Sequence, residues 1–261
     1  MGWQVSDWYV RRLRRGPSWS RERTSGSWPD ARLARWRRGT YEPFVWSERQ
    51  RMFLVIARYW LLNSAAAAAG KHTRSWASGY YFEFGCHGAR TMRMAFDTFR
   101  HAFDWSYVAF DSFEGLPDIP PEEAQDGLWR QGDLSTSEEE FVRRCRRHGM
   151  PPERLMTVKG FYDDSLTPQL QDRLLPRKAL VVYVDCDLYG STVPVLEFVR
   201  PFLQPGSVIV FDDWFLYHGN PAEGERRAFA EFRARHPGLQ FEPLLATGEL
   251  QAFVLVGDDT G

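Results

Sequence analysis

The chain has 261 residues, of which 43% are hydrophobic, 15% aromatic and 26% charged, a composition typical of globular proteins. Its 33 basic and 34 acidic side chains give a formal net charge of −1, which argues against a protein that binds polyanions over its whole surface. The three cysteines, Cys86, Cys145 and Cys186, cannot all pair and lack metal-type spacing, so we expect a reduced, cytoplasmic compartment.

The N-terminal segment, residues 1–46, differs in composition from the rest of the chain. It is rich in arginine, poor in acids, and holds six of the eleven tryptophans, so it is positive while the remainder is negative. We predict an arm of short helices and loops that serves as a lid or as an oligomer contact, followed by a main domain over 47–261. We expect neither a leader peptide nor a membrane span, because the apolar run 52–62 is short and contains Arg58.

Helical and strand patterns alternate through the main domain. A long helix is predicted over 47–69, with Ser47 as N-cap and Gly70 as the stop. The later helices are predicted over 89–103, 137–148, 168–174, 191–203 and 223–235. The strands are predicted over 80–85, 107–111, 156–160, 180–185, 208–212, 241–245 and 252–256.

This alternation predicts an α/β fold with a mostly parallel, seven-stranded sheet and helices on both faces. The last two strands are too close together to enclose a helix, so they predict an antiparallel edge strand. In such sheets ligands bind outside the carboxyl ends of the strands, which makes the residues that finish each strand the informative ones.

The first strand ends in a glycine turn that contains Glu83, Gly85, Cys86, His87 and Gly88. The turn is not the GxGxxG dinucleotide fingerprint, because the third glycine is missing. An acid two residues before glycine is typical of S-adenosylmethionine (SAM) sites. The alternative is an ordinary turn between a strand and a helix.

Two further strand ends carry residues that suit a nucleoside-like ligand. Asp111, followed by Ser112, ends the second strand at the spacing where nucleotide folds place a ribose-binding carboxylate. The third strand runs into Gly160, Phe161, Tyr162 and Asp163, whose aromatic rings could flank an adenine. A turn aspartate and core aromatics are the alternatives.

Four aspartates finish the fourth and fifth strands: Asp185, Asp187, Asp212 and Asp213. Neighbouring parallel strands lie about 4.8 Å apart, so these carboxylates converge if the two strands are adjacent. Carboxylates this close stay ionised only beside a balancing cation, and hard oxygen ligands suit Mg²⁺. The alternative is a set of solvated strand-end aspartates.

Four runs occur in order in this sequence: FEFG (82–85), FDSFEGLP (110–117), VDCDLYGST (184–192) and FDDW (211–214). Together with 227–232, they make residues 80–257 resemble the macrocin O-methyltransferase family of antibiotic-sugar methyltransferases. The resemblance implies a class I, Rossmann-like, SAM-dependent and Mg²⁺-dependent methyltransferase domain. It also implies that Asp185, Asp212 and Asp213 bind the metal.

For the cofactor, the resemblance implies that Glu83, Gly85, Asp111 and the turn 160–163 surround SAM. We expect Cys86, His87, Gly88, Ser112 and Asp185 to contribute to the same cofactor site.

The expected reaction methylates a hydroxyl of a small molecule, a sugar or another natural-product acceptor. A bound cation lowers the pKa of an alcohol, and a carboxylate then takes its proton. Asp185 and Asp187 are the predicted catalytic residues, with His218 in reserve. Leu188 excludes the lysine that catechol methyltransferases place at that position.

Three alternatives stay open at this stage. The apolar strand before Asp185 and Asp187 also resembles the DxD motif of metal-dependent glycosyltransferases, which would bind a nucleotide sugar instead of SAM. A non-catalytic binding protein could keep the fold. A nucleic-acid methyltransferase could use the basic arm, but the acidic main domain disfavours a nucleic-acid partner. The sequence leaves a homo-oligomer possible.

Overall fold

The computed structural model describes residues 42–68, 78–121, 123 and 130–258. Most of the arm predicted over 1–46 therefore lies outside the described residues, as does the predicted helix stop at Gly70. All elements described below belong, apart from Glu42, to one compact unit of the chain, Pro43–Gly261.

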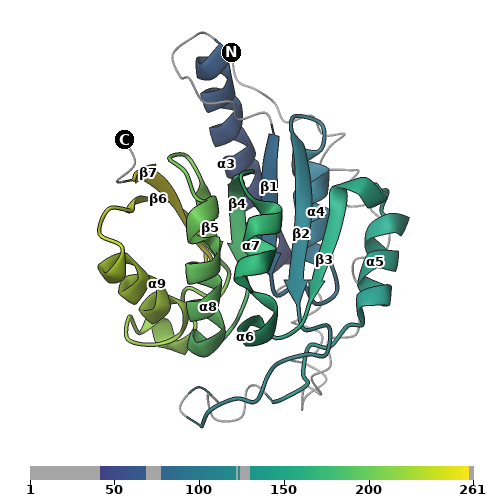
Figure 1. Cartoon of the computed structure of the whole chain (residues 1–261), viewed down its shortest axis with the longest axis vertical. Coiled ribbons are helices and arrows are strands. Elements are labelled where there is room, and N and C mark those ends of the chain that lie inside the picture. Colours follow the sequence, from purple (N-terminus) through teal and green to yellow (C-terminus); the bar gives the residue numbers. More distant parts are fainter. Residues whose placement is uncertain (1–41, 69–77, 122, 124–129, 259–261) are drawn as a thin grey trace. The chain divides into compact units, whose positions relative to one another are not determined.

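A seven-stranded sheet forms the centre of this unit (Figure 1). Its strands are β1 (Ser78–Phe84), β2 (Asp104–Asp111), β3 (Leu155–Lys159), β4 (Ala179–Val184), β5 (Val208–Phe211), β6 (Gln240–Ala246) and β7 (Gln251–Gly257). They lie in the order β3-β2-β1-β4-β5-β7-β6. The first five are parallel, whereas β7 is antiparallel to β5 and to β6.

This topology confirms the predicted α/β class with its mostly parallel sheet and antiparallel hairpin at one edge. Within the hairpin β7 is the antiparallel strand, and β6 is outermost. Every residue of β4 is buried, as expected for a central strand covered on both faces. The strand order reverses between β1 and β4, which places the switch point of the sheet between the glycine turn and the first aspartates.

Helices cover both faces of the sheet (Figure 1). One face packs on α3 (Glu42–Ala68), α4 (Arg90–Phe99) and α5 (Glu138–Arg147). The other face packs on α7 (Pro168–Leu174), α8 (Tyr189–Val199) and α9 (Gly224–Arg235). Short turns of helix complete the list: α6 (Tyr162–Ser165), η4 (Pro152–Arg154), η5 (Arg200–Phe202) and η6 (Tyr217–Gly219).

The helix α3 begins earlier than the sequence predicts. It starts at Glu42 instead of Ser47, because Pro43 suits the first helical turn and Glu42 places a negative charge at the positive helix end. Ser47 is therefore no N-cap: its hydroxyl donates to the carbonyl of Phe44 at 2.7 Å. The prediction over 191–203 was too long as one helix, since the α-helical part ends at Val199 and a 3₁₀ turn containing Pro201 follows.

The path of α3 brings its N-terminal turns to the carboxyl edge of the sheet. Arg49 contacts Asp212 directly after β5, whereas Trp60 meets Trp105 near the start of β2, with ring centroids 6.1 Å apart. The helix thus runs across its face from the edge that carries the predicted site to the opposite edge. None of the helices in the described part of the chain has the length and hydrophobicity of a membrane span.

Candidate active site

The glycine turn after β1 is built against the strand β4. Gly85 has φ +80°, and a Cβ at this position would lie 1.8 Å from the carbonyl oxygen of Asp185. Its N–H donates to the carbonyl of Phe110, and the N–H of Asp185 donates to that of Phe84, at 3.0 and 2.9 Å. Only glycine fits here. Its backbone fixes the turn to Asp185, the first of the aspartates at the ends of β4 and β5, which we call the aspartate edge (Asp185, Asp187, Asp212 and Asp213).

Asp111 ties the glycine turn to the loop that follows β2. Its Oδ2 accepts hydrogen bonds from the backbone N–H groups of Cys86 (2.6 Å) and His87 (3.1 Å). Its Oδ1 accepts from the backbone N–H of Phe113 at 2.7 Å. The predicted ribose-binding carboxylate is thus held by three backbone donors, which fixes its position at the end of β2.

Glu83 lies below the turn and is fully buried. The hydroxyl of Tyr81 donates to its Oε2 at 2.5 Å, and the hydroxyl of Thr91 donates to its Oε1 at 2.7 Å. Burial raises the pKa of Glu83 to about 8, although these two hydrogen bonds act in the opposite direction. The structure therefore places Glu83 where it links β1 to the first turn of α4 and not at the surface.

The other residues predicted for the cofactor surround the same strand ends. His87 is exposed, with its Nδ1 against the carbonyl of Leu134, whereas Cys86 and Gly88 are buried beside it. The hydroxyl of Ser112 donates to the carbonyl of Gly115 at 2.7 Å.

The turn after β3 lies at the next strand end along the sheet. The N–H of Gly160 donates to the carbonyl of Asp111 at 3.0 Å, which joins this turn to the end of β2. Phe161 and Asp163 are exposed, and Tyr162 begins the short helix α6. The hydroxyl of Tyr162 donates to the carbonyl of Phe110 at 3.4 Å. The turns after β1, β2 and β3 therefore form one hydrogen-bonded rim.

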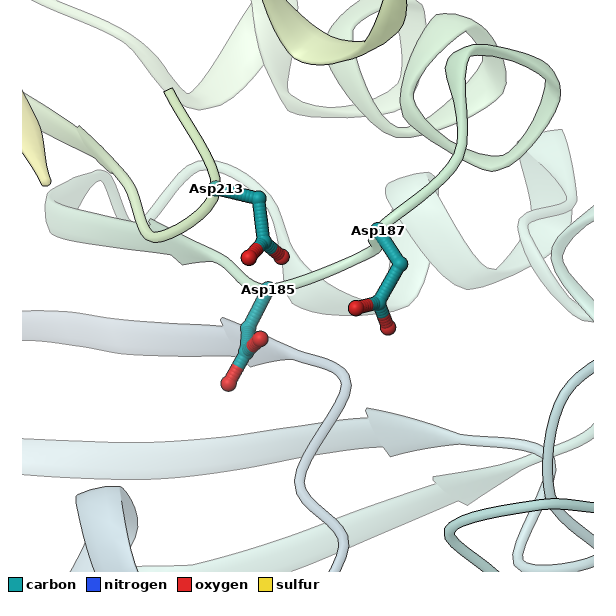
Figure 2. Close-up of side chains that lie close together, drawn as sticks. All are labelled: Asp185, Asp187 and Asp213. Atoms are coloured by element: carbon teal, nitrogen blue, oxygen red, sulfur yellow. The ribbon is translucent and has the colours of Figure 1, made fainter. Parts of the chain in front are cut away.

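Three aspartates meet at the ends of β4 and β5 (Figure 2). Asp185, Asp187 and Asp213 each offer one carboxylate oxygen, and these oxygens lie within 4.8 Å of one another. Asp187 has φ +59°, which turns the chain sharply after β4, and its carbonyl accepts from the hydroxyl of Tyr217 at 3.3 Å. The predicted convergence of strand-end carboxylates is therefore present in the structure, with Asp187 as a member.

Burial and mutual repulsion disfavour the charged forms of these acids. The pKa of Asp185 and that of Asp213 are raised well above their usual range, first by burial and then by the neighbouring aspartates. Burial and the charge of Asp212 raise the pKa of Asp187 to about 7. The three carboxylates thus need a cation or protons to remain together.

Asp212 precedes Asp213 but faces other partners. Its Oδ1 accepts a hydrogen bond from the hydroxyl of Tyr183, and its Oδ2 forms an ion pair with Nη2 of Arg49. Nη1 of the same guanidinium contacts Glu249 at 3.2 Å. The sequence predicted Asp212 as a metal ligand, and the structure instead gives both of its oxygens to protein donors.

The donor set of Asp185, Asp187 and Asp213 fits a divalent cation. Oδ2 of Asp213 is buried and receives no hydrogen bond from the residues that the structure describes. Oε1 of the neighbouring Glu225 is in the same condition, while its Oε2 accepts from the backbone N–H of Asp213 at 3.1 Å. These two buried oxygens without donors, beside three carboxylates that lie close together, are the kind of ligand that a hard cation such as Mg²⁺ prefers.

Sequence reasoning missed three residues of this edge: Arg49, Tyr183 and Glu225. Arg49 is one of several arginines near the chain start, and Tyr183 reads as a core residue of a buried strand. Glu225 has the position of an ordinary first-turn acid in α9. No local pattern distinguishes them, because their partners are far away in the sequence. His218, considered as a reserve base, is exposed in η6.

Comparison with known proteins gives one family. The family model described as macrocin O-methyltransferase (TylF) matches residues 83–244, a range that contains every predicted site residue. Mycinamicin III 3''-O-methyltransferase from Micromonospora griseorubida is 32% identical over 133 residues, 48% of each chain. A rhamnosyl-tetracenomycin-C 4'-O-methyltransferase from Streptomyces olivaceus is 29% identical over 131 residues, 48% of this chain and 46% of its own. The chain thus matches about half the length of these curated relatives.

Solved structures show the same fold. The O-methyltransferase NovP superposes with a TM-score of 0.60 at 20% identity, covering 80% of this chain and 79% of that one. The calicheamicin methyltransferase CalS11 superposes with a TM-score of 0.56 at 23% identity, covering 69% of this chain and 73% of that one. At these identities the likeness describes the class I methyltransferase fold and nothing beyond it.

Proposed function

The chain belongs to the macrocin O-methyltransferase family, and from this premise we propose that it transfers a methyl group from SAM to a hydroxyl of a small molecule. The glycosyltransferase alternative loses its support, since the acids that suggested it lie within a methyltransferase family match. The acceptor we propose is a sugar of a glycosylated natural product. Its relatives from Micromonospora and Streptomyces are named for methylation of such antibiotics.

The observation that carries the proposal is the contact between the glycine turn and the aspartate edge. Gly85 lies directly against the carbonyl of Asp185. The predicted cofactor turn is therefore in contact with the backbone that carries the acid trio, Asp185, Asp187 and Asp213. A methyl donor held by the turn would therefore lie beside carboxylates that can orient a hydroxyl and take its proton. Transfer needs this proximity, because the attacking oxygen must align with the methyl group.

We propose that SAM binds at the carboxyl ends of β1, β2 and β3. Asp111 accepts hydrogen bonds from the backbone of Cys86 and His87, and so fixes the position of the turn. We propose that Glu83 acts on SAM through the turn and α4, since its oxygens are already bonded to Tyr81 and Thr91. Phe161, which is 38% exposed, is available to cover the adenine.

When bound, SAM supplies an electrophilic methyl group and Mg²⁺ lowers the pKa of an alcohol. We propose that Asp185 and Asp213 hold the ion, with Asp187 or Asp212 completing the set. Asp187, on the loop after β4, is the proposed proton acceptor. In the net reaction the acceptor oxygen gains the methyl group, the sulfonium becomes a thioether, and a carboxylate takes the hydroxyl proton.

For the N-terminal arm, residues 1–46, we propose a role as a lid over the acceptor or as an oligomer contact. A chain lacking residues 1–41 tests this while leaving α3 whole. Loss of acceptor turnover with retained SAM binding supports a lid, and a changed mass in solution supports the oligomer contact. Unchanged turnover and unchanged mass would leave the arm without either role.

The function itself is tested with isotope-labelled SAM and a panel of glycosylated acceptors, including mycinamicin III. We expect a new methyl ether on a sugar hydroxyl, loss of turnover with chelator and recovery with Mg²⁺. Calorimetry on the full chain provides the control for binding. Absence of SAM binding would refute the methyltransferase proposal, and chelator-resistant turnover would refute its metal part alone.

A further inference from the structure

Arg49 is the cation that the helix α3 brings to the aspartate edge. Its side chain is 11% exposed and that of Asp212 only 2%, so their ion pair is shielded from water. The guanidinium also contacts Glu249 at 3.2 Å and lies 5.2 Å from the ring centroid of Trp46, one helical turn before it. Contacts on several sides hold Arg49 in this position.

Both carboxylate oxygens of Asp212 have protein partners in this structure. Oδ2 is taken by Arg49 and Oδ1 by the hydroxyl of Tyr183. The next residue, Asp213, is in the opposite condition, since its buried Oδ2 has no donor among the described residues. Two consecutive carboxylates therefore differ in their hydrogen-bond partners, because Arg49 pairs with Asp212 and not with Asp213.

The charge at this edge explains why one arginine does not suffice. Asp185, Asp187, Asp213 and Glu225 gather around the pair, whereas one guanidinium supplies a single positive charge. A divalent cation at the trio and the guanidinium at Asp212 would lie close together and repel each other. Removal of the guanidinium would therefore both relieve this repulsion and free the Asp212 carboxylate for the divalent cation.

We propose that Arg49 competes with a divalent cation for Asp212 and so sets which aspartates face the ion. The proposal rests on the metal site proposed above and adds a positioning residue outside the family match, which begins at residue 83. With Asp212 held by Arg49, the ion meets Asp185, Asp187 and Asp213. With Asp212 released to the ion, Asp187 remains free to accept the proton.

Calorimetric titration of the folded full chain with MgCl₂ and MnCl₂ tests this competition. Arg49→Met should bind either ion about tenfold more tightly than the wild type, the size expected for coupled neighbouring groups. Arg49→Lys, which keeps the charge but loses the forked geometry, should fall between them. Arg58→Met is the matched control, since Arg58 is exposed on the same helix, and it should leave the affinity unchanged.

The same titration in an Asp212→Asn background decides whether Arg49 acts through Asp212. In this background we expect Arg49→Met to give no increase in affinity for either ion. The single variant Asp212→Asn and the double variant should bind the ion equally weakly, or neither should bind it. A tenfold gain that persists without the Asp212 carboxylate would overturn the proposal, since it would show a general effect of charge.

The remaining outcomes separate this proposal from the proposed function. The wild type could bind the ions while Arg49→Met and Arg49→Lys bind them no more tightly. That result would leave the metal site standing and overturn the role of Arg49. A purely structural role of Arg49 predicts weaker binding in both variants and would overturn it too. Absence of binding in every chain would overturn the metal site and the competition with it, while SAM binding, measured separately, would leave the cofactor site standing.

Discussion

Two acidic regions of this protein lie at the same edge of one sheet and are built in opposite ways. At the end of β2, Asp111 accepts three backbone hydrogen bonds. At the ends of β4 and β5, Asp185, Asp187 and Asp213 face one another, and Oδ2 of Asp213 lacks a donor among the described residues. The first region is fixed by backbone hydrogen bonds, whereas the second is a cluster of mutually repelling carboxylates that needs a cation or protons to balance its charge.

The difference shows how a fold divides structural from chemical tasks. A carboxylate that accepts several backbone hydrogen bonds fixes a loop, because charge-assisted hydrogen bonds are stronger than neutral ones. Carboxylates that repel one another need a cation or protons to balance their charge, and the strand ends fix only where they meet. Substitutions that treat the two regions alike should therefore have unlike effects.

The largest effect should come from a clash between the glycine turn, which Asp111 holds, and the aspartate edge. Gly85→Ala places a Cβ against the carbonyl of Asp185 at a φ of +80°, so we expect a loss of about 4 kcal/mol in the free energy of unfolding and no measurable SAM binding. Gly149→Ala is the matched control, since Gly149 has φ +91° but open space around its Cβ position. It should lose about 1 kcal/mol. Urea unfolding and calorimetry measure both, and equal losses in the two variants would contradict the argument.

The next effect concerns the proton acceptor at the unsatisfied edge. Asp187→Asn keeps the shape of the side chain but removes its basicity, so we expect kcat to fall about 1,000-fold while SAM affinity stays unchanged. Single-turnover methyl transfer measures the chemical step. The exposed Asp172 on α7 provides the control Asp172→Asn, which should behave as wild type. Retention of more than a tenth of the wild-type rate would exclude Asp187 as the base.

A third effect is a pH dependence from Glu83, the buried acid beneath the glycine turn. Its pKa is raised by burial to about 8 from an ordinary value of 4.5, so the folded state favours its protonated form. This contribution is complete below the ordinary pKa and is lost as the pH rises toward 8, a change of about 4 kcal/mol. Glu83→Gln should remove that part of the slope.

Urea unfolding at pH 5, 6.5 and 8 compares Glu83→Gln with wild type. Glu139→Gln, a change at an exposed position of α5, is the control and should keep the wild-type slope. Equal slopes in wild type and Glu83→Gln would show that Glu83 is charged in the folded protein.

The smallest effects should have opposite signs in the two acidic regions. Asp111→Asn leaves one acceptor oxygen for three backbone donors, which should cost about 2 kcal/mol of stability. Asp213→Asn removes an acid whose ionised form burial and the neighbouring aspartates disfavour, which should add about 1 kcal/mol to the stability of the metal-free protein. Urea unfolding in the presence of chelator measures both free energies. Effects of the same sign would show that Asp111 and Asp213 do not differ in their contribution to stability.

The fold, and which polar residues finish the strands, could be predicted from the sequence because both depend on local patterns. Short apolar runs, alternating with amphipathic stretches, predicted all seven strands to within about three residues, since burial of strands and helices dictates such patterns. Gly85 was identifiable from a strand followed by a glycine turn. Asp185, Asp187, Asp212 and Asp213 were identifiable because parallel strands bring their carboxyl ends to one edge.

Which oxygen meets which partner was decided by the tertiary structure alone. Asp212 and Asp213 are adjacent and chemically identical in the sequence, yet one pairs with Arg49 and Tyr183 and the other joins Asp185 and Asp187. Arg49 lies 163 residues from Asp212 along the chain, and no periodicity predicts such a pairing. The physical reason is that strand order and backbone twist fix where a side chain points, whereas the sequence fixes only which side chain is there.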